Sequence, residues 1–158
     1  MKLHYFLLMA AGLILMTGAG NTEQNPFPIL KGPYLGQKPP GMTPEIFAPG
    51  IISGDISEGC SGWGNHMEFF VFQRWINRKP RLYIMNQKNG VWTQPVLLPF
   101  GSKYRVGDFT LTPDGKTIVF ASKIFLAEIG SEGEGGNIWM VKKTDAGWTK
   151  PKPFGLGI

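Results

Sequence analysis

The fold is decided by the stretch Phe109-Thr-Leu-Thr-Pro-Asp-Gly-Lys-Thr-Ile-Val-Phe-Ala-Ser122, which reads as two short strands joined by a tight turn. In the turn, Pro113 presets a suitable φ, Asp114 bonds its own backbone, and Gly115 takes the positive φ that a side chain resists. The residues from Thr117 onward are β-branched and aromatic, as in a largely buried strand. The stretch therefore predicts a β-hairpin.

The rest of the chain from Met42 onward repeats this pattern of short β-rich runs between turn signals, and no part carries helical apolar spacing for even three turns. With 22 glycines and 13 prolines the chain is turn-rich, while 13% aromatic residues argue against disorder. The sequence therefore predicts one all-β domain. Its expected strands are Ile46–Ser53, Phe69–Gln73, Arg81–Asn86, Val91–Val96, Asp108–Leu111, Thr117–Ser122, Asn137–Lys142 and Trp148–Phe154.

Two parts of the chain repeat each other. Residues 81–95 align without a gap to residues 137–151, which pairs Trp92 with Trp148 at an offset of 56 positions. Upstream, Phe70-Val-Phe72 aligns with Ile118-Val-Phe120 at an offset of 48 positions, so we expect an inserted loop in the second copy, over Lys123–Gly136. A four-strand unit that recurs every 40 to 50 residues is typical of a β-propeller blade.

The second copy, residues 108–155, resembles the bacterial WD-like β-propeller repeat found in TolB-type proteins. The resemblance rests on Thr112-Pro-Asp-Gly-Lys-Thr-Ile-Val-Phe-Ala-Ser122, Gly136-Asn-Ile-Trp-Met-Val141 and Gly147-Trp-Thr-Lys-Pro151. Residues 42–101 are a poorer copy, because their first hairpin has Gly54–His66 in place of the Pro-Asp-Gly-Lys turn. The resemblance implies an exported propeller of about six to eight blades that binds proteins or carbohydrate.

The chain has room for only about two such blades, over residues 42–101 and 105–155, whereas a closed propeller needs at least four. We therefore expect an incomplete propeller in which the outer faces of both blades are open, with apolar side chains in water. Such a chain is expected to self-associate or to need a missing remainder of the propeller. A truncated, non-functional reading frame is an alternative.

The N-terminal residues are typical of a secretory signal peptide. Lys2 precedes an apolar run over residues 3–16, and small residues follow at positions 17–20. The run is shorter than the roughly 20 residues of a membrane-spanning helix, so we expect cleavage near Gly20, no membrane span afterwards and a periplasmic or extracellular location. An uncleaved anchor or a buried helix is the alternative. Residues 21–41 are rich in proline and glycine and predict an extended leader that packs against the domain.

The best candidate for a binding site is the long connection of the first copy, because loops on one face of a propeller collect binding residues. The candidate residues are Asp55, Glu58, Trp63, His66 and Glu68. His66 is the only histidine after the expected signal peptide, so Ser-His-Asp chemistry or a multi-histidine metal site has no identifiable partners. An irregular structural loop is the alternative interpretation.

No catalytic residue, metal site or cofactor is predicted. Nucleic-acid binding is disfavoured, because the net charge of +5 includes no basic run denser than Arg78-Lys-Pro-Arg81. The leading hypothesis is an exported propeller-repeat protein that binds a protein or a carbohydrate. The alternative is a carbohydrate-active hydrolase or lyase, which needs two carboxylates roughly 5 to 10 Å apart. Its plausible acid-base residues are Asp55, Glu58, Glu68 and Asp108.

Overall fold

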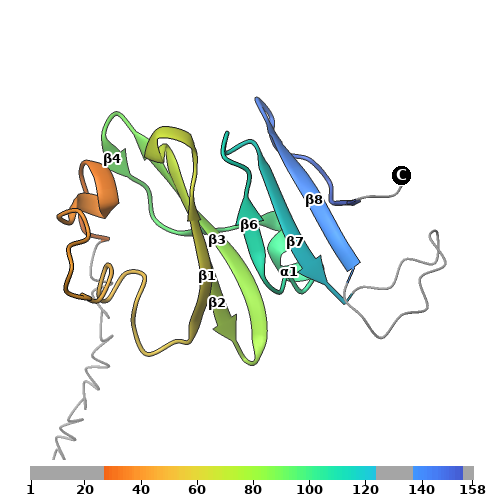
Figure 1. Ribbon diagram of the computed structural model, residues 1–158, viewed down its shortest axis with the longest axis horizontal. Coiled ribbons are helices and arrows are strands. Elements are labelled where there is room, and N and C mark those ends of the chain that lie inside the picture. Colours follow the sequence, from red (N-terminus) through yellow and green to blue (C-terminus); the bar gives the residue numbers. More distant parts are fainter. Residues whose placement is uncertain (1–26, 124–136, 155–158) are drawn as a thin grey trace, which may run out of the picture.

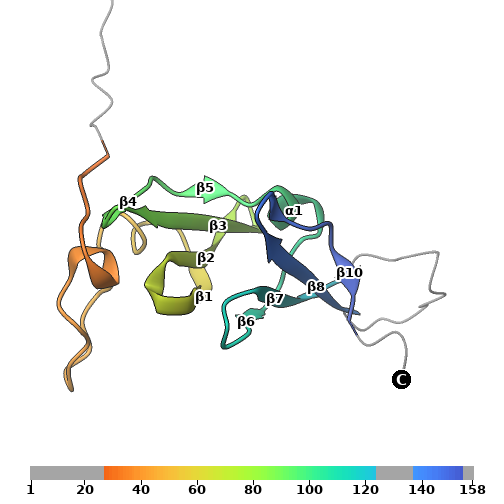
Figure 2. The ribbon, with the colours of Figure 1, turned by 90° about the horizontal axis from the view of Figure 1, so that it is seen from above.

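The computed structural model describes residues 27–123 and 137–154. The expected signal peptide and most of the expected inserted loop lie outside these ranges. Figures 1 and 2 show the described parts in the same order from two directions: the N-terminal segment (residues 27–57), a first sheet and a second sheet. Both sheets are antiparallel, so the predicted all-β class is confirmed.

The first sheet has five strands, of which the last two share one edge of the sheet. Its strands are β1 (Glu58–Trp63), β2 (Phe69–Ile76), β3 (Lys79–Lys88), β4 (Val91–Trp92) and β5 (Val96–Leu97). The order is β1-β2-β3, and both β4 and β5 pair with β3 on the side away from β2. The predicted strand over residues 91–96 is thus interrupted, since Pro95 between the two short strands has no N–H to donate to a ladder.

The second sheet repeats this arrangement. Its strands are β6 (Phe109–Leu111), β7 (Thr117–Ser122), β8 (Asn137–Thr144), β9 (Gly147–Trp148) and β10 (Lys152–Pro153). Val71 of β2 pairs with Gly62 and Ile84, and Val119 of β7 pairs with Thr110 and Met140. These partners are related by the offsets of 48 and 56 positions seen in the sequence. The internal repeat is therefore confirmed, strand by strand and in register.

One predicted strand is wrong. Residues 46–53 form a turn, in which the Ala48 carbonyl accepts hydrogen bonds from the N–H groups of Ile51 and Ile52. The first strand of the first copy is instead β1, whose residues were predicted to lie in a loop. Its residues, Glu-Gly-Cys-Ser-Gly-Trp, have little intrinsic preference for strands, so pairing with β2 decides their conformation.

The turn before β2 also corrects an expectation, because the first copy forms the same turn as the second without the Pro-Asp-Gly-Lys sequence. The Gly64 N–H bonds the Phe69 carbonyl at 2.8 Å, as the Thr112 N–H bonds the Thr117 carbonyl at 2.9 Å. Met67 has a φ of 58° where the second copy has Gly115 at 66°. This hydrogen bond and this positive φ are thus shared, whereas His66 has a φ of 50° and its equivalent Asp114 is not among the positive-φ residues. The first copy places the Met67 side chain where glycine is the unstrained choice.

In the second copy the turn is stabilised by its aspartate. The Asp114 carboxylate accepts a hydrogen bond from the Thr112 hydroxyl at 2.5 Å and one from the Lys116 N–H at 2.9 Å. The Thr112 bond first, and then the Lys116 bond, lower the pKa of Asp114 because both favour the ionised form. The predicted turn role of Asp114 is confirmed.

The two sheets pack face to face around one apolar core. Phe69, Val71, Leu82 and Ile84 of the first sheet meet the second sheet there, and the second sheet contributes Ile118, Phe120, Trp139 and Val141. The short helix α1 (Pro99–Lys103), which the sequence pattern did not predict, carries the chain from one sheet to the other (Figures 1 and 2). Its Phe100 ring stacks on Phe120, with 5.8 Å between ring centroids.

The side chain of Gln73 joins the two copies within this interface. Gln73 is 2% exposed, and its amide nitrogen donates to the carbonyls of Val106 at 3.0 Å and Gly107 at 2.7 Å. Both carbonyls belong to the connection that leads into β6. A buried amide that satisfies two backbone acceptors holds this connection against the first sheet.

The N-terminal segment covers the opposite face of the first sheet. Leu35, Ala48 and Ile52 of the segment are buried, with Phe27 and Leu30 partly buried, in a second core with Phe70, Phe72, Met85 and Trp92. Ile29 is 77% exposed, so it does not share in this packing. The expectation that both outer sheet faces are open is therefore wrong for the first sheet, because the chain's own N-terminal segment covers that face.

The outer face of the second sheet is different, and we call it the open face. Apart from Ala121, Lys142 and Lys152, which share the face as cross-strand partners, it consists of Thr117, Val119, Ile138 and Met140. Their register equivalents in the first sheet are Phe69, Val71, Leu82 and Ile84, all 7% exposed or less. On the open face Ile138 is 44% exposed and the other three are half-buried. The same strand positions thus carry a covered face in one copy and an uncovered one in the other.

Candidate functional site

The five candidate residues do not form one site. Asp55 lies in a bend before β1, while Glu58 and Trp63 occupy the first and last positions of that strand. A strand of this length spans roughly 17 Å. His66 and Glu68 follow in the hairpin turn, which contains the short helix η2 (Asn65–Met67). The residues are therefore spread along the whole edge of the first sheet.

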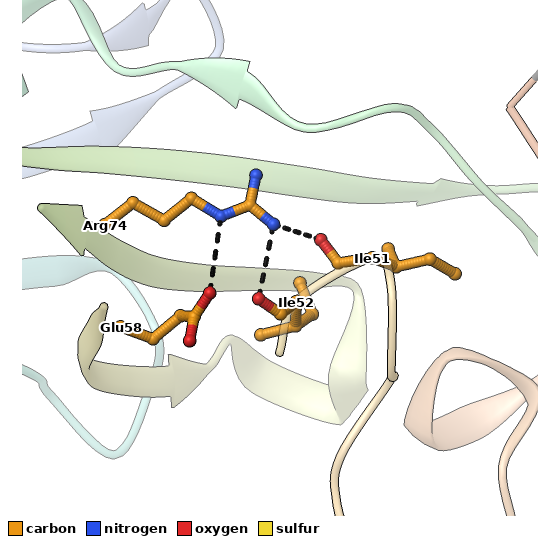
Figure 3. A network of polar contacts seen from close by, with 4 residues as sticks. All are labelled: Ile51, Ile52, Glu58 and Arg74. Carbon is orange, nitrogen blue, oxygen red and sulfur yellow. Dashed lines mark hydrogen bonds and ion pairs between the residues drawn. The ribbon is translucent and has the colours of Figure 1, made fainter. Parts of the chain in front are cut away.

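Glu58 takes part in a structural contact with Arg74 of β2, drawn in Figure 3. The Arg74 Nη2 atom donates to the carbonyls of Ile51 and Ile52, the latter at 3.3 Å, and Nε lies 3.9 Å from Glu58 Oε1. The guanidinium also lies 5.0 Å above the Phe72 ring. Since these contacts join the N-terminal segment to β2, the position of Glu58 is explained by packing.

His66 and Glu68 belong to the turn that matches the Asp114 turn in the second copy. His66 has a φ of 50° and is exposed. Glu68 Oε2 lies 4.0 Å from Lys143 Nζ, and that ammonium lies 4.3 Å from the Phe69 ring centroid. Lys143 is on β8, so this contact links the two sheets at the surface and does not enclose a ligand.

Glu58 and Glu68 are not placed as a pair for acid-base hydrolysis. Glu58 and Glu68 flank opposite ends of β1, which is farther apart than the roughly 5 to 10 Å that a glycosidase pair requires. Asp108 Oδ1 accepts a hydrogen bond from the Cys60 thiol at 3.4 Å. Within residues 27–123 and 137–154, no three His, Cys, Asp or Glu side chains are grouped so that they could hold a metal ion.

Trp63 lines a pocket that the other four candidates do not reach. The pocket has a volume of about 560 Å³ and lies between the N-terminal segment and the first sheet. The Trp63 ring lies 4.3 Å from Phe70, 5.8 Å from Tyr34 and 5.9 Å from Phe47, measured between centroids. These aromatic rings come from three separate parts of the chain and form one continuous wall. We call this the Trp63 pocket.

The N-terminal segment supplies most of the remaining lining. It contributes Gln37, Lys38, Pro39, Pro40, Gly41, Thr43, Pro44, Glu45 and Ile46, and β1 adds Ser61. Lys38 Nζ and Glu45 Oε1 form an exposed ion pair at 2.7 Å. The sequence did not predict these lining residues, because the proline-rich leader was expected only to pack against the domain. The signal that was available is the aromatic content of the leader, above all Tyr34.

Comparisons with known proteins give no information on the function of the chain, so its interpretation depends on the geometry described above. No family model, curated protein or solved structure matches the chain. In the described ranges, no helix combines the length and the apolar character needed to cross a membrane. The resemblance to TolB-type repeats remains a prediction from the sequence.

Proposed function

We propose that the chain is an exported β-propeller-repeat protein that acts as a binding module, and that the open face is where it engages its partner. The observation that carries this proposal is the exposure of Ile138, at 44%, in the strand position where the first copy buries Leu82 at 0%. An uncovered apolar patch rimmed by polar or charged side chains, here Lys142 and Lys152, is typical of protein interaction sites.

The packing of the two copies suggests what covers such a face. In the first copy the equivalent face meets Ile118, Phe120, Trp139 and Val141 of the second sheet. A partner that presents a further four-stranded sheet with a similar aromatic and aliphatic surface would continue the same stacking. Successive blades of a β-propeller are arranged in this way, which supports the proposed repeat class.

The end of the second copy supports the same proposal. Phe154 is the equivalent of Leu98, since the Phe154 N–H bonds the Ile138 carbonyl as the Leu98 N–H bonds the Leu82 carbonyl, both at 2.8 Å. Leu98 is 2% exposed beneath the neighbouring sheet, whereas Phe154 is 55% exposed. The uncovered region therefore extends from the strands to the residue that follows them.

With a second copy of the chain as the partner, replacing Ile138 with lysine is expected to weaken self-association through the open face about tenfold or more, because an ammonium group would have to be desolvated there. Sedimentation velocity or light scattering over a micromolar concentration series measures the effect. The matched control is Val96→Lys, since Val96 is 57% exposed on β5 and its equivalent in the second sheet is Lys152. A parent chain that stays monomeric, or equal effects of both substitutions, would contradict the proposed interface.

Export is tested separately. We expect protein isolated from its host to begin just after Gly20, because a charged start, an apolar run and small residues precede that point. Mass spectrometry of the N-terminal peptide measures this. Mature protein that retains Met1 would show that the segment is not a cleaved signal.

A further inference from the structure

We propose that the Trp63 pocket is a binding site for an uncharged, largely apolar organic ligand that carries a ring system. This inference does not depend on the open face, which is on the far side of the second sheet. Figure 2 shows the N-terminal segment and β8 on opposite sides of the first sheet. The two proposals can therefore fail independently.

The wall of the pocket favours a flat apolar ring. Tyr34, Phe47 and Phe70 surround Trp63, with edge-to-face angles of 82° and 80° to Tyr34 and Phe47. Such contacts fix the ring orientations, because edge-to-face pairs at these separations are energetically preferred. Trp63 is only half-buried, so part of this aromatic wall remains accessible. A rigid aromatic surface binds a planar partner with little loss of side-chain freedom.

The charges at the rim favour an uncharged ligand. Lys38 and Glu45 are the only charged side chains in the lining, and each neutralises the other at 2.7 Å. An ionised ligand would meet no unpaired counter-charge and would lose hydration on entry. Exposed apolar side chains, Met42 at 101% and Ile46 at 72%, extend the apolar surface beside the pocket. The polar side chains of the lining are partly committed to each other, since Lys38 pairs with Glu45 and Gln37 Oε1 accepts the Ala48 N–H, so a hydroxyl-rich sugar would find fewer partners than it has hydroxyl groups.

The size and the anchoring of the pocket fit a preformed small-molecule site. Its volume of about 560 Å³ lies within the usual range for such sites. Gln37 Oε1 accepts the Ala48 N–H at 3.0 Å, which closes the segment over the pocket. The Trp92 indole N–H bonds the Gly32 carbonyl at 2.7 Å, and Arg74 bonds Ile51 and Ile52. The segment is thus attached to the sheet on both sides of the pocket.

The test uses a matched pair of fluorescent probes, N-phenyl-1-naphthylamine and its sulfonated relative 8-anilinonaphthalene-1-sulfonate. They share an arylamine ring system and differ in charge. Titrated into the full chain, the neutral probe is expected to bind at one site with a Kd of roughly 1 to 100 μM. We expect it to bind at least ten times more tightly than the sulfonate, and cellobiose and maltose to compete poorly.

Two variants locate the binding. Ser61→Phe places an aromatic ring in the pocket, and it suits the strand because the equivalent position of the second copy is Phe109. We expect affinity for the neutral probe to fall at least tenfold. Ser57→Phe is the matched control, since Ser57 is exposed and does not line the pocket. Trp63→Ala should also lower affinity, but it removes core contacts, so Ser61→Phe is decisive.

Four outcomes would overturn the inference. They are the absence of saturable binding, equal affinity for the sulfonate, tighter binding of a sugar than of the neutral probe, and unchanged binding in a folded Ser61→Phe variant. Melting curves of both serine variants establish that they are folded. Loss of association at the open face with retained probe binding would affect only the proposed function, and the reverse result would affect only this inference.

Discussion

Replacing Gly115 with valine is expected to lower the free energy of unfolding by about 2 to 6 kcal/mol. Two effects combine at this position. Gly115 has a φ of +66°, which a β-branched residue resists. A Cβ atom there would also lie 2.4 Å from the backbone nitrogen of Asn65, in the matching turn of the first copy. The two turns are therefore in close contact, and the substitution strains both.

Denaturant unfolding measures this loss, and two other substitutions separate its causes. Gly90→Val introduces a similar strain at a φ of +75° but meets no atom within 4 Å, so it should cost only about 1 to 3 kcal/mol. Met67→Gly is expected to stabilise the chain slightly, because Met67 holds the same positive φ in the first copy. Equal losses for Gly115→Val and Gly90→Val would mean that the two turns do not touch.

Replacing Gln73 with leucine should cost about 2 to 4 kcal/mol. The shape of the side chain is roughly kept, but the carbonyls of Val106 and Gly107 lose their donor in a buried place. The main cost is the desolvation of these two acceptors. Thermal and denaturant unfolding measure it, and a loss below about 0.5 kcal/mol would show that water replaces the amide without penalty.

A second substitution tests the same contact from the other side. A Cβ atom added at Gly59 would lie 2.2 Å from Gln73 Oε1, so Gly59→Ala should displace the amide. If both substitutions act on one contact, their effects on the free energy of unfolding should not add in the double variant. If the losses in free energy of unfolding were additive, Gly59→Ala would act through a contact other than the one with the Gln73 amide.

The parts of the fold that the sequence predicted well are those set by local chemistry. Pro113, Asp114 and Gly115 determine their turn within a few residues, and the recurrence of Trp92 at Trp148 reveals the repeat without any knowledge of distant contacts. The strand β1 could not be found in this way. Its glycines and serine carry no strand preference, and only its pairing with β2 defines it.

The pocket escaped prediction for a related reason. Tyr34, Phe47 and Trp63 are far apart in the sequence, and they meet only because the N-terminal segment folds back over the first sheet. The apolar run at residues 46–53 predicts a strand, whereas these residues form a turn beside the pocket. Trp63 is among the predicted site residues, but its neighbours in the structure are Tyr34, Phe47 and Phe70 and not the polar residues of its own loop.

The cover on the first sheet limits how copies of the chain can assemble. Head-to-tail stacking would require the open face of one copy to reach the first sheet of the next, where the N-terminal segment, with Leu35 and Ile52, already lies. Growth into a fibre is therefore blocked at one end of each copy. If two copies met through their open faces, the described N-terminal segments would lie on the two outer sides, so this contact would be symmetric and would close at a dimer.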